Sequence, residues 1–130
     1  MQPSPMKEET VGPNTKGAFF EDRAAEFLSF KGYKILERNF RSRFGEIDII
    51  ARDFKYIAFI EVKARAHNFT VSGLEAIDKR KRDSIRKTAL IYAAGGEFLS
   101  RFDVLEIIQG RHWRRYILIK DAFRMTEEDF

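Results

Sequence analysis

Apolar side chains recur at helical spacing in two segments of the chain. From about Lys16 to Lys31 four of them fall at i, i+4, i+7 and i+8, which forms one apolar stripe along a helix. They are Phe20, Ala24, Phe27 and Leu28. The pattern predicts a first helix over 16–31, ended by Gly32 in a left-handed conformation.

A second helix is predicted from about Leu74 to Ala94, and Gly95 with Gly96 would end it. Its stripe contains a charged position between apolar ones. The stripe comprises Ile77, Lys81, Ile85, Thr88 or Ala89, and Tyr92. A lysine on an apolar stripe needs an anionic partner, or it must extend its ammonium group to solvent.

Strand-like patterns predict five strands, at 33–41, 45–51, 56–65, 101–109 and 115–120. A tight turn near Arg52 to Lys55 makes the second and third strands antiparallel. The helix between the third and fourth strands is a crossover, and such connections usually join parallel strands. The predicted fold class is therefore α/β, a mixed β-sheet flanked by helices in the order α-β-β-β-α-β-β.

Composition limits the chain to one domain outside any membrane. The 130 residues, 44% of them hydrophobic, suffice for one core, which we place at 15–130, while the proline-containing segment 1–14 is expected to be a flexible tail. No cysteine is present, which excludes disulfides and thiolate zinc sites. No apolar run approaches the roughly 20 residues of a membrane span, and the N-terminus has no signal-peptide pattern, so we expect a cytoplasmic protein.

The formal net charge of +4 changes this picture only slightly. Clustered Lys and Arg bind polyanions by releasing counterions from phosphates. A solvated basic surface explains the same charge equally well. Charge alone therefore leaves both interpretations open.

Acidic residues stand inside the two most apolar strands, in "GEIDII" and "FIEVKAR". Side chains alternate across a strand. Alternation places on one face of the second strand Glu46, Asp48 and Ile50, and on one face of the third Phe59, Glu61, Lys63 and Arg65. A turn centred on Phe54 and Lys55 would put Asp48 opposite Glu61, and Glu46 opposite Lys63.

Two opposed carboxylates explain the acids if they hold a cation. Opposed side chains have Cβ atoms about 4.5–5.5 Å apart, where two carboxylates repel and raise each other's pKa. Oxygen donors without His or Cys suit Mg²⁺ or Mn²⁺, and Lys63 on the same face could reach a phosphate oxygen. The alternative is an ordinary half-exposed strand face, with one acid paired to Lys63.

Several motifs together resemble the YraN-like family of small bacterial proteins. They are "GAFFEDRAAEFLSFKGYKILERNFR", "GEIDII", "FIEVKAR" and "RFDVLEI", and the resemblance extends from Gly17 to about Phe123. Members of that family are predicted endonucleases, distantly related to archaeal Holliday-junction resolvases. The resemblance implies a restriction-endonuclease-like fold with the PD-(D/E)xK active-site pattern.

Carried over residue by residue, the pattern assigns a catalytic site. Asp48 matches the first acid, Glu61 the second and Lys63 the lysine. Asp48, Glu61 and the carbonyl of Val62 would hold Mg²⁺ or Mn²⁺, and Lys63 would orient water and stabilise charge on the phosphate. Glu21 matches an acid that adjoins the metal site in the resolvases.

The resemblance also extends to the basic start of the second helix. The family has a lysine at the position of Lys81, which suggests a contact to phosphate or to the active site. With Lys79, Arg80 and Arg82 it forms a basic run that could follow a DNA backbone without reading bases. Basic helix faces are more often simply solvated.

The expected function is a metal-dependent DNA endonuclease that acts on branched or damaged DNA. DNA is the expected partner, read by structure rather than by sequence, and a homodimer is suggested only by analogy with resolvases. Two alternatives stay open at this point. One is a nucleic-acid-binding module of the same fold that does not cut, and the other is a protein-interaction domain.

Overall fold

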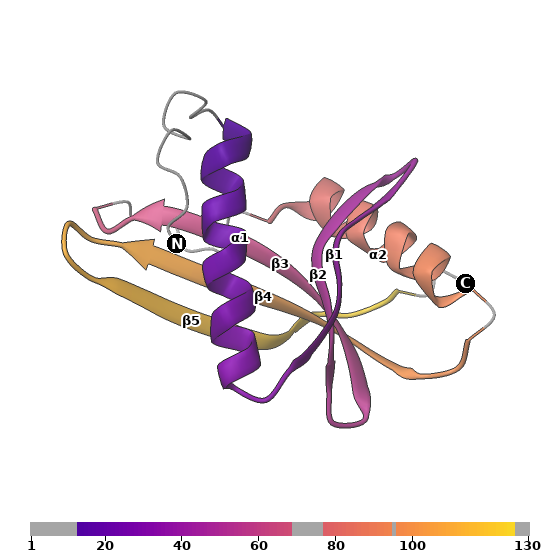
Figure 1. Ribbon diagram of the computed structural model, residues 1–130. Helices are drawn as coiled ribbons and strands as arrows, with labels where there is room; N and C mark the ends of the chain where they lie inside the picture. The colour runs from indigo at the N-terminus through magenta and orange to yellow at the C-terminus, as the bar shows by residue number, and fades with distance from the viewer. Residues whose placement is uncertain (1–12, 69–76, 95, 127–130) are drawn as a thin grey trace.

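A mixed five-stranded sheet with one helix on each face forms the core of the protein (Figure 1). The computed structural model describes residues 13–68, 77–94 and 96–126. The elements are α1 (Pro13–Phe30), β1 (Lys34–Ser42), β2 (Gly45–Asp53), β3 (Tyr56–Ala66), α2 (Lys79–Ala93), β4 (Leu99–Gln109) and β5 (Arg114–Phe123). This order and the mixed α/β class confirm the prediction.

The strands lie in the sheet in sequence order, from β1 to β5. Neighbours β3 and β4 are parallel, and the other three pairs are antiparallel. The parallel pair follows from the chain between β3 and β4, which includes α2 and crosses over one face of the sheet.

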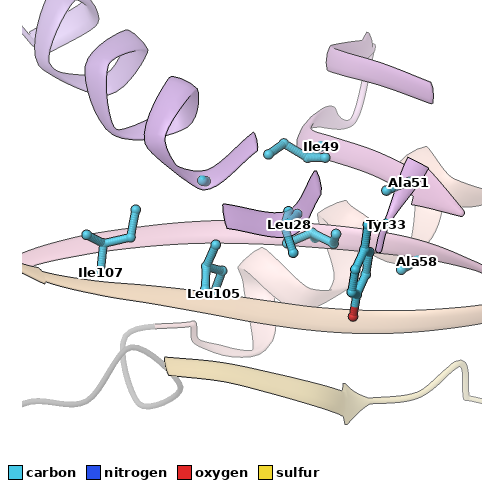
Figure 2. Close-up of a cluster of buried hydrophobic side chains, with 9 residues drawn as sticks. Leu28, Tyr33, Ile49, Ala51, Ala58, Leu105 and Ile107 are labelled. Carbon is cyan, nitrogen blue, oxygen red and sulfur yellow. The ribbon is translucent and has the colours of Figure 1, made fainter. Parts of the chain in front are cut away.

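Each helix covers its own face of the sheet with an apolar cluster. Ala24 and Leu28 of α1 pack on Ile49 of β2 and Leu105 of β4, as Figure 2 shows for the labelled residues of this cluster. On the opposite face, α2 packs against β2, β3 and β4. That cluster includes Ile85 and Ala89 of α2, Ile50, Phe59 and Phe102.

The first helix begins earlier than its apolar stripe indicates. It starts at Pro13, inside the expected tail 1–14, and proline fits the first turn of a helix because its missing N–H is not needed there. Residues 1–12 lie outside the described part of the chain. At the other end Gly32 has φ of 98°, which confirms the predicted left-handed conformation.

The second helix begins at Lys79 rather than at Leu74. The Asp78 side chain accepts a hydrogen bond from the Lys81 N–H at 2.9 Å, which satisfies a donor of the first turn and starts the helix. Ile77 is buried just before that start, so it belongs to the core without being helical. The predicted helical residues 74–76 and Gly95 lie outside the described residues.

Within residues 13–68, 77–94 and 96–126, no helix has both the length and the apolar character needed to cross a bilayer. A cytoplasmic location stays a prediction.

Candidate active site

The predicted register of β2 and β3 is confirmed up to the point where the two strands separate. Their pairing runs from Asp53 opposite Tyr56 to Ile49 opposite Ile60, around the turn at Phe54. The next pair along would be Asp48 and Glu61, but the backbone ladder ends before it. Beyond this point β1 and β2 diverge from β3 (Figure 1).

Alternation along β2 breaks at Asp48. Ile47 and Ile50 both pack in the cluster beneath α2, whereas Ile49 packs beneath α1. In a strictly alternating strand, residues three apart face opposite sides, so the side chains of 47–50 do not alternate strictly, although the pairing with β1 stays in register there. The predicted common face of Asp48 and Ile50 was therefore wrong.

The neighbouring strand is irregular at the same level. In β1, Arg38 pairs with Ile49 and Phe40 with Ile47, which leaves Asn39 across from Asp48. Asn39 has φ of 56°, in the left-handed region that asparagine enters more readily than most residues. Beyond this level the tip of the β1–β2 hairpin rises out of the plane of the other strands (Figure 1).

The Asp48 side chain spans the gap between β2 and β3. Its Oδ2 accepts a hydrogen bond from the backbone N–H of Val62 at 2.8 Å. The N–H and C=O of one strand residue point to the same side, so the Val62 carbonyl also faces this gap. Asp48 and the Val62 carbonyl thus bring oxygen atoms to the point where the strands part.

Glu61 is buried beside this gap, with lysines on one side of it. Its side chain is 5% exposed, and its Oε2 lies 3.8 Å from Nζ of Lys63 and 3.6 Å from Nζ of Lys81. Its other oxygen, Oε1, is buried and has no hydrogen-bond partner within the described residues. Buried polar atoms are nearly always satisfied, so this oxygen requires an explanation.

The two carboxyl groups resist being ionised together. Burial first, and then the charge of Asp48, raise the pKa of Glu61 to about 8, against the opposing effects of Lys81 and Lys63. Burial also raises the pKa of Asp48, although the Val62 N–H acts to lower it. Without a bound cation, the pair therefore retains a proton at neutral pH.

Glu21 approaches the same gap from α1. Its Oε1 accepts hydrogen bonds from Nη2 of Arg38 at 3.0 Å and from Nδ2 of Asn39 at 2.8 Å. Burial raises the pKa of Glu21, and the charge of Asp48 contributes to the rise. Glu21, Asp48 and Val62 all line an open pocket of about 600 Å³. The pocket leads from the surface to the gap.

The donor set fits a hard divalent cation. No three His, Asp or Glu side chains gather as ligands in the part of the chain that the structure describes. The available donors are the carboxylates of Asp48 and Glu61 and the Val62 carbonyl. Mg²⁺ prefers to be held by a few protein oxygens, while water and substrate occupy its remaining coordination positions. A cation there would also give Glu61 Oε1 a partner.

The basic residues at the start of α2 make different contacts and do not form one exposed surface. Lys81 Nζ lies 3.6 Å from Oε2 of Glu61, and its role as a phosphate or active-site contact stays a prediction. Arg82 donates through Nη1 to the Ile77 carbonyl at 2.8 Å, so it holds the chain before the helix. Lys79 and Arg80 are exposed, and Lys79 is also paired with Asp83. Contact of these two residues with DNA stays a prediction.

Sequence reasoning missed the groups that hold the acids at the margin of the site. Glu46 pairs with Arg41 of β1 at 3.0 Å, and among the ion pairs of the described residues none joins it to Lys63. Arg38 and Asn39, which hold Glu21, were not identified as site residues. The one available signal was Asn39 itself, because asparagine is disfavoured inside strands and marks irregular backbone.

Comparisons with known proteins agree with the YraN-like resemblance. A family model described as Uncharacterised protein family UPF0102 matches residues 20–107. A UPF0102 protein of Clostridium botulinum strain 657 is 47% identical over 115 residues, which cover 84% of this chain and 94% of that protein. A UPF0102 protein of Sulfurihydrogenibium sp. strain YO3AOP1 is 47% identical over 97 residues, which cover 71% of this chain and 83% of the relative.

Proposed function

This chain belongs to the UPF0102 family, and we propose that it is a metal-dependent endonuclease that cleaves phosphodiester bonds in DNA. One observation carries the proposal. The buried Glu61 lies beside Asp48 and within 4 Å of two lysines, yet one of its oxygens has no partner in the described part of the chain. The resemblance to the PD-(D/E)xK pattern of restriction-endonuclease-like proteins supports the same assignment.

In this proposal the oxygen donors at the gap bind the cation. Asp48, Glu61 and the Val62 carbonyl would hold Mg²⁺ or Mn²⁺. When bound, the cation supplies Lewis-acid chemistry and neutralises charge on the phosphate. In the reaction the water oxygen bonds to phosphorus, the ester P–O bond breaks, and the departing oxygen takes a proton.

The two lysines have different tasks. Lys63 lies on the same strand as Glu61, and its Nζ is within reach of both the acid and a phosphate held at the gap. It would orient the water and stabilise the charge that develops on the phosphate. Lys81 comes from α2 and compensates the charge of the same Glu61 oxygen. Both side chains are 36% exposed, which leaves their ammonium groups accessible to a substrate.

Glu21 acts at the margin of the site. Arg38 and Asn39 fix its carboxylate close to Asp48, in the wall of the open pocket. From there Glu21 can accept a hydrogen bond from a water molecule that approaches the phosphate. The net charge of +4 favours a polyanionic substrate, for which DNA is the simplest choice.

Cleavage assays test the proposal directly. Linear, nicked, flapped and four-way DNA are incubated with the protein in Mg²⁺, in Mn²⁺ and in chelator. We expect cleavage of at least one branched or nicked substrate with metal and none in chelator, and loss of cleavage in Asp48→Asn. Glu37→Gln removes a charge from an exposed residue of β1 and serves as the matched control.

Two outcomes would contradict the endonuclease. Binding of DNA without metal-dependent cleavage would favour a nucleic-acid-binding module. No affinity for any DNA would favour a protein-interaction domain.

A further inference from the structure

The turn between β4 and β5 carries an aromatic and basic cluster outside the site described above. Residues Gly110–Arg115, here called the β4–β5 tip, read G-R-H-W-R-R. Arg111, His112, Trp113 and Arg115 are all exposed, and the Trp113 side chain, the single tryptophan of the chain, has 47% of its surface open. The tip lies at the end of the sheet where β3 and β4 finish (Figure 1).

The turn holds the Trp113 ring in a fixed position. A Cβ atom at Gly110 would lie only 2.2 Å from Cε2 and 2.4 Å from Nε1 of the indole, so the ring packs directly on the glycine backbone. The Gly110 N–H donates to the Trp113 carbonyl at 2.8 Å, and Nε2 of Gln109 donates to the carbonyls of both residues. The exposed part of the indole is therefore presented by a rigid turn.

One guanidinium and one imidazole lie next to this ring. The Arg115 guanidinium lies 5.9 Å from the centre of the indole, and His67 at the end of β3 packs against its edge. None of the ion pairs formed among the described residues involves Arg111 or Arg115. Arg114 differs, because it donates to Gln109 and belongs to the turn itself.

The tip lies within reach of a strand that occupies the candidate site. In the parallel register, Glu61 is level with Val104 and Ala66 is level with Gln109. Five residues of strand at about 3.3 Å each separate the two levels by roughly 16 Å. One strand of duplex DNA advances about 3.4 Å per nucleotide, so the distance corresponds to about five nucleotides.

We propose that the β4–β5 tip binds an unpaired nucleotide of the substrate, with its base stacked on Trp113 and its phosphates contacted by Arg111 and Arg115. The proposal rests on the proposed function, because the distance to the tip is counted from the scissile phosphate at the gap. It narrows the substrate to nucleic acid with a single-stranded segment within about five nucleotides of the cleavage point.

The chemistry favours an unpaired strand over a continuous duplex. A duplex buries the faces of its bases against their neighbours, whereas an unpaired base has an open face for an aromatic ring. Stacking tolerates every base, because each has a π-face, so the contact selects structure and not sequence. The exposed Arg115 guanidinium at the ring, and the exposed Arg111 in the same turn, add the charge that a phosphate backbone requires.

The single tryptophan provides a direct readout. The full chain, in chelator so that no cleavage occurs, is titrated with an oligothymidine 15-mer and with a blunt duplex of equal length while Trp emission is recorded. Quenching by the oligothymidine, with little change for the duplex, is the expected result. Oligothymidine binding that is detected by anisotropy of a labelled strand but leaves the emission unchanged would overturn the inference, as would no binding at all.

Variants separate stacking from charge. Trp113→Ala should weaken oligothymidine binding by about 5- to 150-fold and leave duplex binding nearly unchanged, while Trp113→Phe keeps a ring and most of the affinity. Phe54→Ala is the control, since Phe54 is 86% exposed in the turn between β2 and β3, at the other end of β3. An equal loss in Trp113→Ala and Phe54→Ala, or wild-type affinity in Trp113→Ala, would contradict the proposal.

Cleavage assays distinguish this inference from the proposed function. Binding that depends on Trp113, in a protein that cleaves nothing with metal, would support the tip and refute the endonuclease. If the wild type cleaves flapped DNA, and Trp113→Ala binds it with the same affinity and cleaves it at the same rate, the proposal for the tip is wrong and the proposed endonuclease function is supported.

Discussion

The Asp48 carboxylate accepts a hydrogen bond from the Val62 N–H at 2.8 Å, across the gap where β2 and β3 stop pairing. A side-chain oxygen thus takes the place that a backbone carbonyl of β2 would hold in a continuous ladder. This bond fixes Asp48 beside Glu61 and leaves the Val62 carbonyl facing the gap. The separation of the strands and the convergence of oxygen atoms are therefore one structural feature.

Lys63→Ala tests the role of the lysine beside this gap. If Lys63 stabilises charge in the transition state, the variant should keep its affinity for DNA and Mg²⁺ and lose turnover by about 100-fold or more. Single-turnover cleavage and binding titrations measure the two effects separately. Lys55→Ala, in the turn between β2 and β3, is the control. Cleavage by Lys63→Ala at the wild-type rate would remove Lys63 from the mechanism.

The exposed cations of α2 are tested by the double variant of Lys79 and Arg80 to alanine. If both contact phosphates, the slope of log affinity against log salt should become shallower by about 1.8, for DNA of any sequence. The double variant of Lys34 and Lys55 to alanine loses the same charge at the opposite end of the sheet. Equal slopes in the two double variants would show that the α2 residues are only solvated.

The raised pKa of Glu61 predicts how stability depends on pH. The pKa is about 8 in the folded protein and near 4.5 for an unperturbed glutamate, so the folded state binds the extra proton between these values. The free energy of unfolding should therefore decrease as pH rises from about 5 to 8 in chelator. Melting temperatures across this pH range measure the effect. In Glu61→Gln, whose side chain cannot ionise, the melting temperature should decrease less as pH rises. A decrease of the same size in Glu61→Gln would show that other groups cause it.

Local patterns predicted the register of β2 and β3 because a tight turn at Phe54 fixes which residues are opposed. The same reasoning could not predict that the ladder stops at Ile49. That stop depends on the left-handed Asn39 in β1 and on a bond from the Asp48 side chain to Val62, both of which require three strands to be in place. Local sequence patterns do not predict contacts between residues that are far apart in the sequence.

The start of α2 shows a second limit of the sequence pattern. Ile77 extends the apolar stripe, so periodicity alone predicts a longer helix. The structure buries Ile77 from a non-helical position and starts the helix at Lys79, after the Asp78 cap. Burial of an apolar side chain therefore does not establish the backbone conformation that carries it.

The central claim is that Asp48 and Glu61 form one cation site, and melting curves of the wild type and Asp48→Asn test it most directly. The variant keeps an oxygen that can accept the Val62 N–H and removes the charge that repels Glu61. In chelator and above pH 8, where both carboxyl groups of the wild type are ionised, it should be as stable as the wild type, or more stable by about 0.2–1 kcal/mol.

Excess Mg²⁺ should then raise the melting temperature of the wild type and leave that of Asp48→Asn nearly unchanged, because a ligand stabilises only the state that binds it. The contrary result is a variant that melts below the wild type in chelator, together with a wild type that does not respond to Mg²⁺. That outcome would make Asp48 an ordinary structural acid of β2.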